Sequence, residues 1–399
     1  MTTANQPRLA VVLSHPTQYY SPWFRWLRGH APLDFRVFYL WDFGVTNRRD
    51  PEFGVSLAWD VDLLSGYDAD FVPNRAARPG TGHFWGLRNP ALPGRLAAWR
   101  PDAVLVFGYK YASHLRAIVW CRAHGVPLIF RGDSHLLGLA PPGVAKRALL
   151  RLLYRQFAAV TYVGAANREY FEAFGVPGDR LHFAPHAVDH TLFDPSSAAH
   201  RDAARTLRTE LGIAADRRVV LFAGKLLPRK QPRALLEAFL AAPRPDTTLV
   251  FVGDGGEKPA LETRAAQARD ADVRFLPFAN QSAMPACYLL ANLFVLPSAG
   301  GYETWGLAVN EAMHMGVPCL VSDVVGCQRD LVMDGATGWV FRAGDQAQLT
   351  ARLTTALEVL ARDAAGLRDR VKQRIGGYTY AQTTDGLLQA VAAATAAHQ

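Results

Sequence analysis

The 399-residue sequence lacks the segments that mark membrane and secreted proteins. No apolar run approaches the roughly 20 residues that a helix needs to span a bilayer. The polar start, 1–7, has no positively charged segment leading into an apolar stretch and a cleavage site. We therefore expect a protein that stays in the cytoplasm.

Cysteine is scarce, and the few cysteines are scattered. Cys121, Cys287, Cys319 and Cys327 form no C-x-x-C pair with a matching His or Cys set, so a zinc site is not expected. Because disulfides are rare in a reducing compartment, we expect free thiols.

Signatures of nucleic-acid binding and of dinucleotide binding are also missing. The formal net charge of +8 at pH 7 favours acidic partners. The basic residues are spread along the chain without a Lys/Arg block, a zinc finger or an RNA-binding signature, so no nucleic-acid partner is expected. The first apolar run is followed by 14–19 without G-x-G-x-x-G, which disfavours a nicotinamide dehydrogenase.

What the sequence does have is a regular alternation of short apolar runs and helix-like segments. Runs rich in Val, Ile and Leu are typical of parallel strands that are covered on both faces. The runs are 9–13, 35–40, 103–107, 127–130 and 159–163, then 219–222, 249–252, 273–276, 293–296 and 318–321. The polar stretch 190–217 between the two sets is predicted to be a linker or irregular. The pattern predicts an α/β protein with two Rossmann-like domains facing each other across a cleft.

The most informative segment follows the run 293–296. It is a Gly-rich turn that leads into a helix, with Glu303 at the helix start and Glu311 eight residues later. Backbone N–H groups at a helix start attract an anion such as a diphosphate. With a rise of about 1.5 Å per residue, the two carboxylates are expected roughly 12 Å apart, the length of a sugar–diphosphate–ribose unit. Spacing alone leaves an alternative, in which one of the two carboxylates interacts with the helix dipole and the other lies on a solvated face of the helix.

Several motifs in order resemble the retaining glycosyltransferases of family 4, which have the GT-B fold. The most specific is the E-x7-E element from Glu303 to Glu311. The others are 185–189, which resembles P-N-G-V-D, 222–230, which resembles a G-R-x-x-x-x-K phosphate motif, and 296–298, 316–318, 322–323 and 334–338. The resemblance covers nearly all of the C-terminal half and, more loosely, most of the first half.

The resemblance implies a domain layout. Residues 1–190 would form an N-terminal acceptor-side domain, and residues 191–378 a C-terminal domain that binds the nucleotide-sugar donor. A terminal helix, about 379–399, would pack back on the first domain.

The resemblance also implies roles for residues of the second half. Glu303 would contact donor sugar hydroxyls, and Glu311 would bind the ribose diol. The diphosphate would be held by the backbone around Trp305, Gly306 and Leu307, with Gly224 and Thr304 completing the donor site. Lys225 and Lys230 would neutralise the leaving diphosphate, which lowers the barrier to transfer. Lys225 stands where the family usually has Arg, so the charge is kept but the planar fork is lost.

The acceptor side departs from the family pattern. The usual Gly-rich loop after the first strand is replaced by His15-Pro16-Thr17-Gln18-Tyr19-Tyr20. Residues that follow predicted strands of the first half are therefore candidates for the acceptor side: His15, Gln18, Tyr19, Tyr109, Arg131, Asp133 and His135. Asp133 is preferred as a catalytic group that binds an acceptor hydroxyl. A turn capped by Asp133 or Ser134, and a hydrogen-bonded loop histidine at His15, remain the alternatives.

The segment 145–157 is predicted to be a basic amphipathic helix. Arg147, Arg151 and Arg155 share one face, and Leu149, Leu150, Leu153 and Phe157 fall largely on another. Such a helix either contacts an anionic membrane peripherally or packs on its own sheet with its arginines facing water.

Together these features predict a retaining transfer of a sugar from a nucleotide diphosphate sugar to an acceptor hydroxyl. The acceptor would be a glycan, a lipid-linked glycan or a small molecule, the leaving phosphate would take the acceptor proton, and no metal or other cofactor is expected. Because the 15–20 segment resembles enzymes of that kind, the predicted setting is cell-surface polysaccharide assembly. A GT-B epimerase or hydrolase of nucleotide sugars, and a non-catalytic donor-binding module, are the alternatives.

Overall fold

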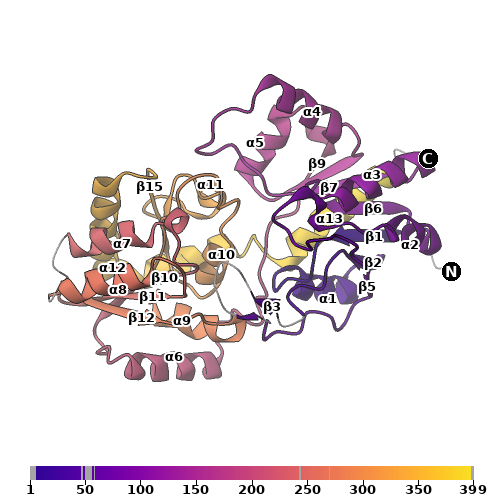
Figure 1. The fold of residues 1–399 in the computed structure, drawn as a ribbon. Helices are drawn as coiled ribbons and strands as arrows, with labels where there is room; N and C mark the ends of the chain where they lie inside the picture. Colours follow the sequence, from indigo (N-terminus) through magenta and orange to yellow (C-terminus); the bar gives the residue numbers. More distant parts are fainter. Residues whose placement is uncertain are drawn as a thin grey trace.

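The computed structural model describes residues 6–45, 48–49, 56–57, 59–241, 244–268 and 270–396. These residues form two α/β lobes that lie side by side (Figure 1). Each lobe is built around a parallel sheet whose central strands are almost entirely buried, as the apolar runs of the sequence predict, whereas the edge strands 69–71, 181–183 and 272–276 are only partly buried.

The sheet of the first lobe has the order β5-β2-β1-β6-β7-β8-β9. Its strands are β1 (Arg8–Leu13), β2 (Asp34–Tyr39), β5 (Ala69–Phe71), β6 (Ala103–Phe107), β7 (Leu128–Arg131), β8 (Ala159–Tyr162) and β9 (Leu181–Phe183). The direction in which strands are added reverses at β1. In open α/β sheets, ligands bind outside the carboxyl ends of the strands at such a reversal.

Helices cover this sheet. They are α1 (Tyr20–His30), α2 (Leu92–Trp99), α3 (Ala112–His124), α4 (Val144–Tyr154) and α5 (Ala165–Ala173), with the short 3₁₀ turns η1 (Phe84–Gly86) and η2 (Gly178–Arg180). A short antiparallel pair, β3 (Arg48–Arg49) and β4 (Ser56–Leu57), lies outside the main sheet.

The sheet of the second lobe has the order β12-β11-β10-β13-β14-β15 and reverses at β10. Its strands are β10 (Arg218–Ala223), β11 (Thr247–Val252), β12 (Asp272–Leu276), β13 (Leu293–Leu296), β14 (Cys319–Ser322) and β15 (Gly338–Phe341). Its helices are α6 (Ala198–Glu210), α7 (Pro232–Leu240), α8 (Lys258–Gln267), α9 (Met284–Leu290), α10 (Leu307–His314), α11 (Gln328–Leu331) and α12 (Gln346–Ile375), with the 3₁₀ turns η3 (Pro228–Lys230) and η4 (Gln281–Ala283).

The last helix, α13 (Tyr380–Ala396), returns to the first lobe (Figure 1). Its Leu387 and Val391 belong to the same apolar cluster as Leu9 of β1, and Thr384 accepts a hydrogen bond from Trp23 Nε1 at 3.0 Å. A Cβ added to Gly386 would lie only 1.9 Å from the carbonyl oxygen of Phe183. Glycine at this position therefore permits the close approach of α13 to the sheet.

The ten apolar runs predicted to be strands all overlap strands of the two sheets. The prediction of irregular structure for 190–217 is wrong in its centre, where α6 forms. Ser197 caps this helix through its side chain, and Leu207 and Leu211 pack against the core of the second lobe. The exposed face of α6 carries Arg201, Asp202 and Arg205, and these charged residues hide the helical periodicity when composition alone is considered.

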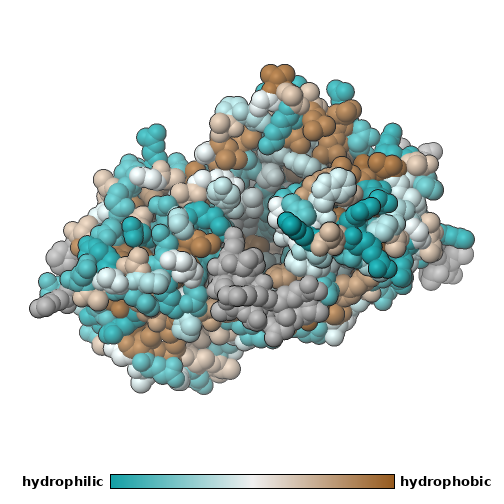
Figure 2. Space-filling view, viewed as in Figure 1, coloured by the Kyte–Doolittle hydropathy of each residue, from teal (hydrophilic) through white to brown (hydrophobic). Residues whose placement is uncertain are grey.

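Helix α4 lies on the outside of the first lobe and is apolar on two sides. Leu150 and Tyr154 are buried beneath it, whereas Val144, Leu149 and Leu152 are 87%, 65% and 58% exposed. Figure 2 shows hydrophobic residues beside hydrophilic ones over this part of the lobe. Leu149, which was predicted to fall on the same face as Leu150, lies on the exposed side of the helix instead. Within the described residues, no helix combines the length and apolar character required to cross a bilayer.

Candidate active site

A cavity of about 500 Å³ lies between the two lobes. It opens at the carboxyl ends of β1, β10, β11 and β13. In each sheet this includes the strand at which the strand order reverses, β1 in the first and β10 in the second. The first lobe contributes His15, Thr17, Gln18, Tyr19, Phe43, Trp59 and Asp133 to its wall. The second lobe contributes, among others, Gly224, Lys225, Arg229, Lys230, Ser298, Glu303, Thr304, Trp305, Gly306, Leu307 and Glu311.

The start of α10 forms part of the cavity wall. The helix begins at Leu307, after Gly306 with φ +96°, and a Cβ at Gly306 would lie 2.9 Å from Cγ1 of Val325. A positive φ is adopted readily by glycine alone, so the turn depends on this residue. Since the first turn of a helix leaves N–H groups without intrahelical acceptors, this part of the wall suits an anion.

Glu303 lies in the loop that precedes α10 and not in the helix itself. Its separation from Glu311 is therefore set by the loop, and the estimate from helical rise does not apply. The Glu303 carboxylate forms an ion pair with Lys230 Nζ and accepts a hydrogen bond from Ser298 Oγ at 3.0 Å. Lys225 and Arg229 line the same side of the cavity. The structure thus brings the E-x7-E element and the 222–230 motif together.

Glu311 lies at the deeper end of the cavity and is 3% exposed. Its carboxylate accepts hydrogen bonds from Gln281 Nε2 at 3.0 Å and from Tyr288 Oη at 2.7 Å. Burial raises the pKa of Glu311, and these hydrogen bonds oppose that shift. Gln281 lies in η4 and Tyr288 in α9, and no motif in the sequence pointed to either residue.

Tyr19 crosses from the first lobe to this carboxylate. It was predicted on the acceptor side, and it lines the cavity together with Glu311. Burial, followed by the negative charge of Glu311, raises the pKa of Tyr19, so the phenol stays protonated. Tyr19 is thus a first-lobe residue that lies within the electrostatic reach of the Glu311 carboxylate.

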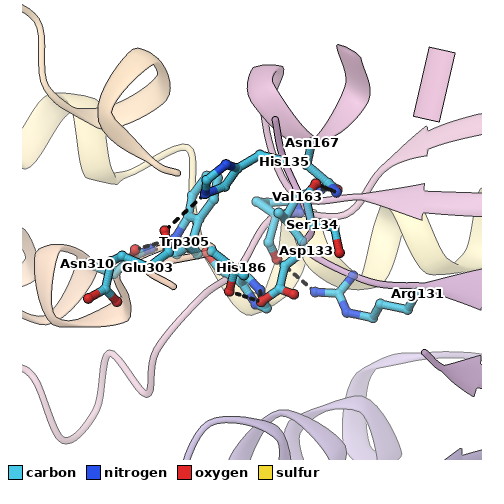
Figure 3. Close-up of polar contacts among 12 residues, drawn as sticks. Arg131, Asp133, Ser134, His135, Val163, Asn167, His186, Glu303, Trp305 and Asn310 are labelled. Carbon is cyan, nitrogen blue, oxygen red and sulfur yellow. Dashed lines mark hydrogen bonds and ion pairs between the residues drawn. The ribbon is translucent and has the colours of Figure 1, made fainter. Parts of the chain in front are cut away.

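Asp133 faces the cavity from the end of β7 (Figure 3). Its Oδ2 accepts a hydrogen bond from Thr304 Oγ1 of the second lobe at 2.8 Å and lies 3.5 Å from His186 Nε2. Burial acts to raise the pKa of Asp133, but the hydrogen bonds from His186 and Thr304 outweigh it, so the pKa is lowered. Burial lowers the pKa of His186. The carboxylate is therefore ionised near neutral pH, with His186 Nε2 beside it.

Three of the predicted acceptor-side residues lie away from the cavity wall. Arg131 is buried and donates to the carbonyl oxygen of Ala184 at 2.9 Å, where it supports the segment that leads to the second lobe. His135 donates through Nε2 to the backbone carbonyl of Glu303 at 3.2 Å (Figure 3). Tyr109 packs against the rings of Phe130 and Tyr154. These three side chains contact other parts of the protein and not the cavity. Their positions at strand ends did not reveal this, because such a position alone does not decide which way a side chain points.

Several cavity residues were not predicted. Phe43 and Trp59 come from the loop between β2 and β5, where no motif points to them. Arg229 could have been found, since it lies within the 222–230 motif.

All four cysteines are free and buried. In the part of the chain that the structure describes, no group of three or more His, Cys, Asp or Glu side chains is placed to hold a metal ion.

Two parallel-sheet domains that share a cavity at the carboxyl ends of their strands define the GT-B class of protein. HepE from Anabaena in complex with UDP has the same fold. It superposes with a TM-score of 0.72 at 17% identity, covering 97% of this chain and 100% of that one. The fold-class prediction is therefore confirmed.

Sequence comparisons identify the family. Residues 33–187 match the glycosyl transferase 4-like domain, and residues 204–374 match glycosyl transferases group 1. A GDP-mannose-dependent alpha-mannosyltransferase of Mycolicibacterium smegmatis is 32% identical over 67% of this chain and 68% of its own length. The D-inositol 3-phosphate glycosyltransferase of Nocardia farcinica is 31% identical over 57% of this chain. The chain belongs to the family 4 glycosyltransferases. It spans about half the length of the first curated relatives that it matches.

Proposed function

We propose that this chain is a retaining glycosyltransferase that moves a sugar from a nucleoside diphosphate sugar to an acceptor hydroxyl. The observation that carries the proposal is the meeting of four features in one cavity. These are the carboxylates of Glu303 and Glu311, the start of α10, and the cationic side chains of the 222–230 segment. Along the chain, the start of α10 lies between Glu303 and Glu311, as the diphosphate lies between the sugar and the ribose in such a donor.

In this proposal each end of the donor meets its own partner. Glu303 binds hydroxyls of the donor sugar, and Glu311 binds the ribose diol at the buried end of the cavity. The diphosphate lies against the start of α10, where backbone N–H groups and the helix dipole favour negative charge. HepE, solved with UDP, and the relative named as GDP-mannose-dependent support a nucleoside diphosphate as the carrier.

The cations of the second lobe would act when the glycosidic bond breaks. Negative charge then develops on the leaving diphosphate, and fixed positive charges in a site that excludes water lower that barrier. Lys225, Arg229 and Lys230 line the cavity near the start of α10 and would supply this charge without a metal. We propose that the acceptor hydroxyl attacks on the face that the diphosphate leaves, so that a phosphate oxygen takes its proton and the anomeric configuration is retained.

Donor binding and its dependence on Glu311 test the proposal. A panel of nucleoside diphosphate sugars should include at least one that stabilises the protein, by about 2.7 kcal/mol at 100 times its Kd. Glu311→Ala is expected to lose this stabilisation, because the ribose then has no carboxylate to bind. The measurement is thermal unfolding with and without each donor.

Glu262→Ala, on the exposed face of α8, is the matched control and should keep the full donor effect. The unliganded Glu311→Ala variant is compared by circular dichroism, since the loss leaves Gln281 and Tyr288 without their acceptor. Full donor stabilisation in a folded Glu311→Ala variant would show the ribose assignment to be wrong. With a donor in hand, NMR of the product determines whether the anomeric configuration is retained.

We propose cell-surface polysaccharide assembly at the cytoplasmic face of a membrane as the setting, with α4 as the contact. Val144, Leu149 and Leu152 are exposed on this helix beside Arg147, Arg151 and Arg155. An exposed apolar strip flanked by arginines suits the surface of an anionic bilayer.

Reversing the charge of these three arginines to Glu is expected to abolish binding to vesicles that contain phosphatidylglycerol. Each basic residue near an anionic surface contributes about 1 kcal/mol to binding. The same net change made on α12, with Arg362, Arg368 and Lys372 replaced by Glu, is the control and should leave most of the binding. Co-sedimentation measures both variants, and equal binding by the α4 variant and the wild type would remove α4 from the proposal.

A further inference from the structure

The two lobes contribute opposite charge to the cavity. Among the described residues that line it, the three cationic side chains are Lys225, Arg229 and Lys230, and all three belong to the second lobe. The first lobe contributes no Lys or Arg to the described lining and contributes one carboxylate, Asp133. Since the second lobe holds the E-x7-E element and the start of α10, the side left for an acceptor is the one whose described lining carries no Lys or Arg.

Asp133 gives this side a fixed negative charge. Its carboxylate is held between Thr304 Oγ1 and His186 Nε2, and its side chain is 40% exposed. Both of these contacts are made by Oδ2, and the other carboxylate oxygen, Oδ1, takes part in neither (Figure 3). An ionised carboxylate in this position accepts hydrogen bonds from hydroxyl groups and repels a phosphate group.

The other described residues of the first-lobe wall are neutral and in large part aromatic. The His15 ring lies edge-on to Phe43, with ring centres 5.4 Å apart, and Trp59 lines the same cavity. Burial lowers the pKa of His15 to about 4, so its imidazole carries no charge at neutral pH. Thr17 and Gln18 add neutral hydrogen-bonding groups. Apolar faces combined with a few neutral polar groups are what a ligand with both C–H and hydroxyl surfaces requires.

We propose that the acceptor is an uncharged sugar ring and that phosphorylated acceptors are rejected. Asp133 binds hydroxyl groups of this ring, and the aromatic side chains of Phe43 and Trp59 pack against it. This inference rests on the proposed function. It separates the chain from those of its relatives that are named for inositol 3-phosphate, because among the described residues of the first-lobe wall an acceptor phosphate would meet Asp133 and no Lys or Arg.

Paired acceptors test the inference. With the donor found by thermal shift, kcat/KM is measured for methyl mannoside against mannose 6-phosphate, methyl glucoside against glucose 6-phosphate, and myo-inositol against inositol 1-phosphate. The neutral member of the best pair is expected to be favoured at least about ten-fold, because like charges brought close together in an interface oppose binding. A phosphorylated acceptor used as well as or better than its neutral partner would overturn the inference.

The ratio between neutral and phosphorylated acceptors identifies the cause, since a general loss of activity cancels in it. Asp133→Asn should move this ratio toward one, whereas Glu172→Gln, a carboxylate on the outer face of α5, should leave it unchanged. Trp59→Ala should raise KM for the neutral acceptor and leave the donor Kd unchanged, with the exposed Trp85→Ala as its control. A ratio that Asp133→Asn does not change would overturn the role of Asp133.

The donor experiments are run on the same preparations, so the two kinds of failure are distinguishable. If no donor stabilises the protein, the proposed function fails. If a donor binds and depends on Glu311, but a phosphorylated acceptor is favoured, the donor site stands and the present inference alone is wrong.

Discussion

Replacing Lys230 by Met is expected to lower kcat for sugar transfer by about 10²- to 10³-fold, the loss typical of removing one preorganised charge from a transition state. Lys230 Nζ pairs with the Glu303 carboxylate in the cavity, beside the start of α10. When the donor is cleaved, negative charge grows on the diphosphate at this place. Met keeps most of the length and apolar surface of the side chain, so the change tests the charge.

The expected loss lies in kcat more than in donor binding, because the charge on the diphosphate grows as the bond breaks. Steady-state kinetics with saturating acceptor measure kcat, and calorimetry measures the donor Kd. Glu303→Gln provides a second measurement: if the two residues act as a pair, the double variant loses less than the product of the two single losses.

Lys258→Met is the matched control for Lys230→Met. Lys258 is also a half-buried lysine of the second lobe that pairs with a carboxylate, Asp254 at 2.7 Å, but it lies outside the cavity lining. Its loss should leave kcat within a few-fold of the wild type, because Lys258 lies outside the cavity lining. The lost ion pair should lower the free energy of unfolding by about 1 kcal/mol or less. Equal effects of the two substitutions would mean that Lys230 serves the structure and not the reaction.

Trp305→Ala is expected to reduce the free energy of unfolding by about 3–5 kcal/mol, the range for loss of a buried aromatic side chain. Trp305 is 3% exposed, and its ring lies within 5.8 Å of the His186 ring and 6.1 Å of the Tyr378 ring, centre to centre. Its Nε1 donates to Asn310 Oδ1 at 2.8 Å. Because it directly precedes Gly306, the cavity left by its removal would also loosen the start of α10.

Two variants separate the causes of that loss. Trp305→Phe keeps most of the packing but leaves the buried Asn310 Oδ1 without a donor, which costs about 1–3 kcal/mol. Trp85→Ala removes a tryptophan that is 63% exposed and should change stability by no more than about 0.5 kcal/mol. Urea unfolding, followed by fluorescence and by circular dichroism, measures all three, and a Trp305→Ala loss no larger than that of Trp85→Ala would contradict the packing argument.

The strands and the donor-side motifs could be predicted because their signals are local. A doubly covered parallel strand must be apolar along its whole length, so 9–13 or 219–222 identifies itself in the sequence. A turn that brings a helix start toward a ligand requires glycine, and Gly306 is visible in the same way. Helix α6 was missed because its inward face is narrow and its outward face is dominated by charge.

The sequence by itself determined the α/β alternation, the Gly-rich turn before α10, and the Glu303 and Glu311 pair, since each of these depends on residues close together in the chain. The tertiary structure alone decided which side chains meet across the lobes. Tyr19 reaches Glu311, Asp133 receives Thr304, and Arg131 turns inward to the carbonyl of Ala184. These contacts join residues more than 50 positions apart, and their geometry depends on how two sheets and the segment between them pack, which no local pattern of residues records.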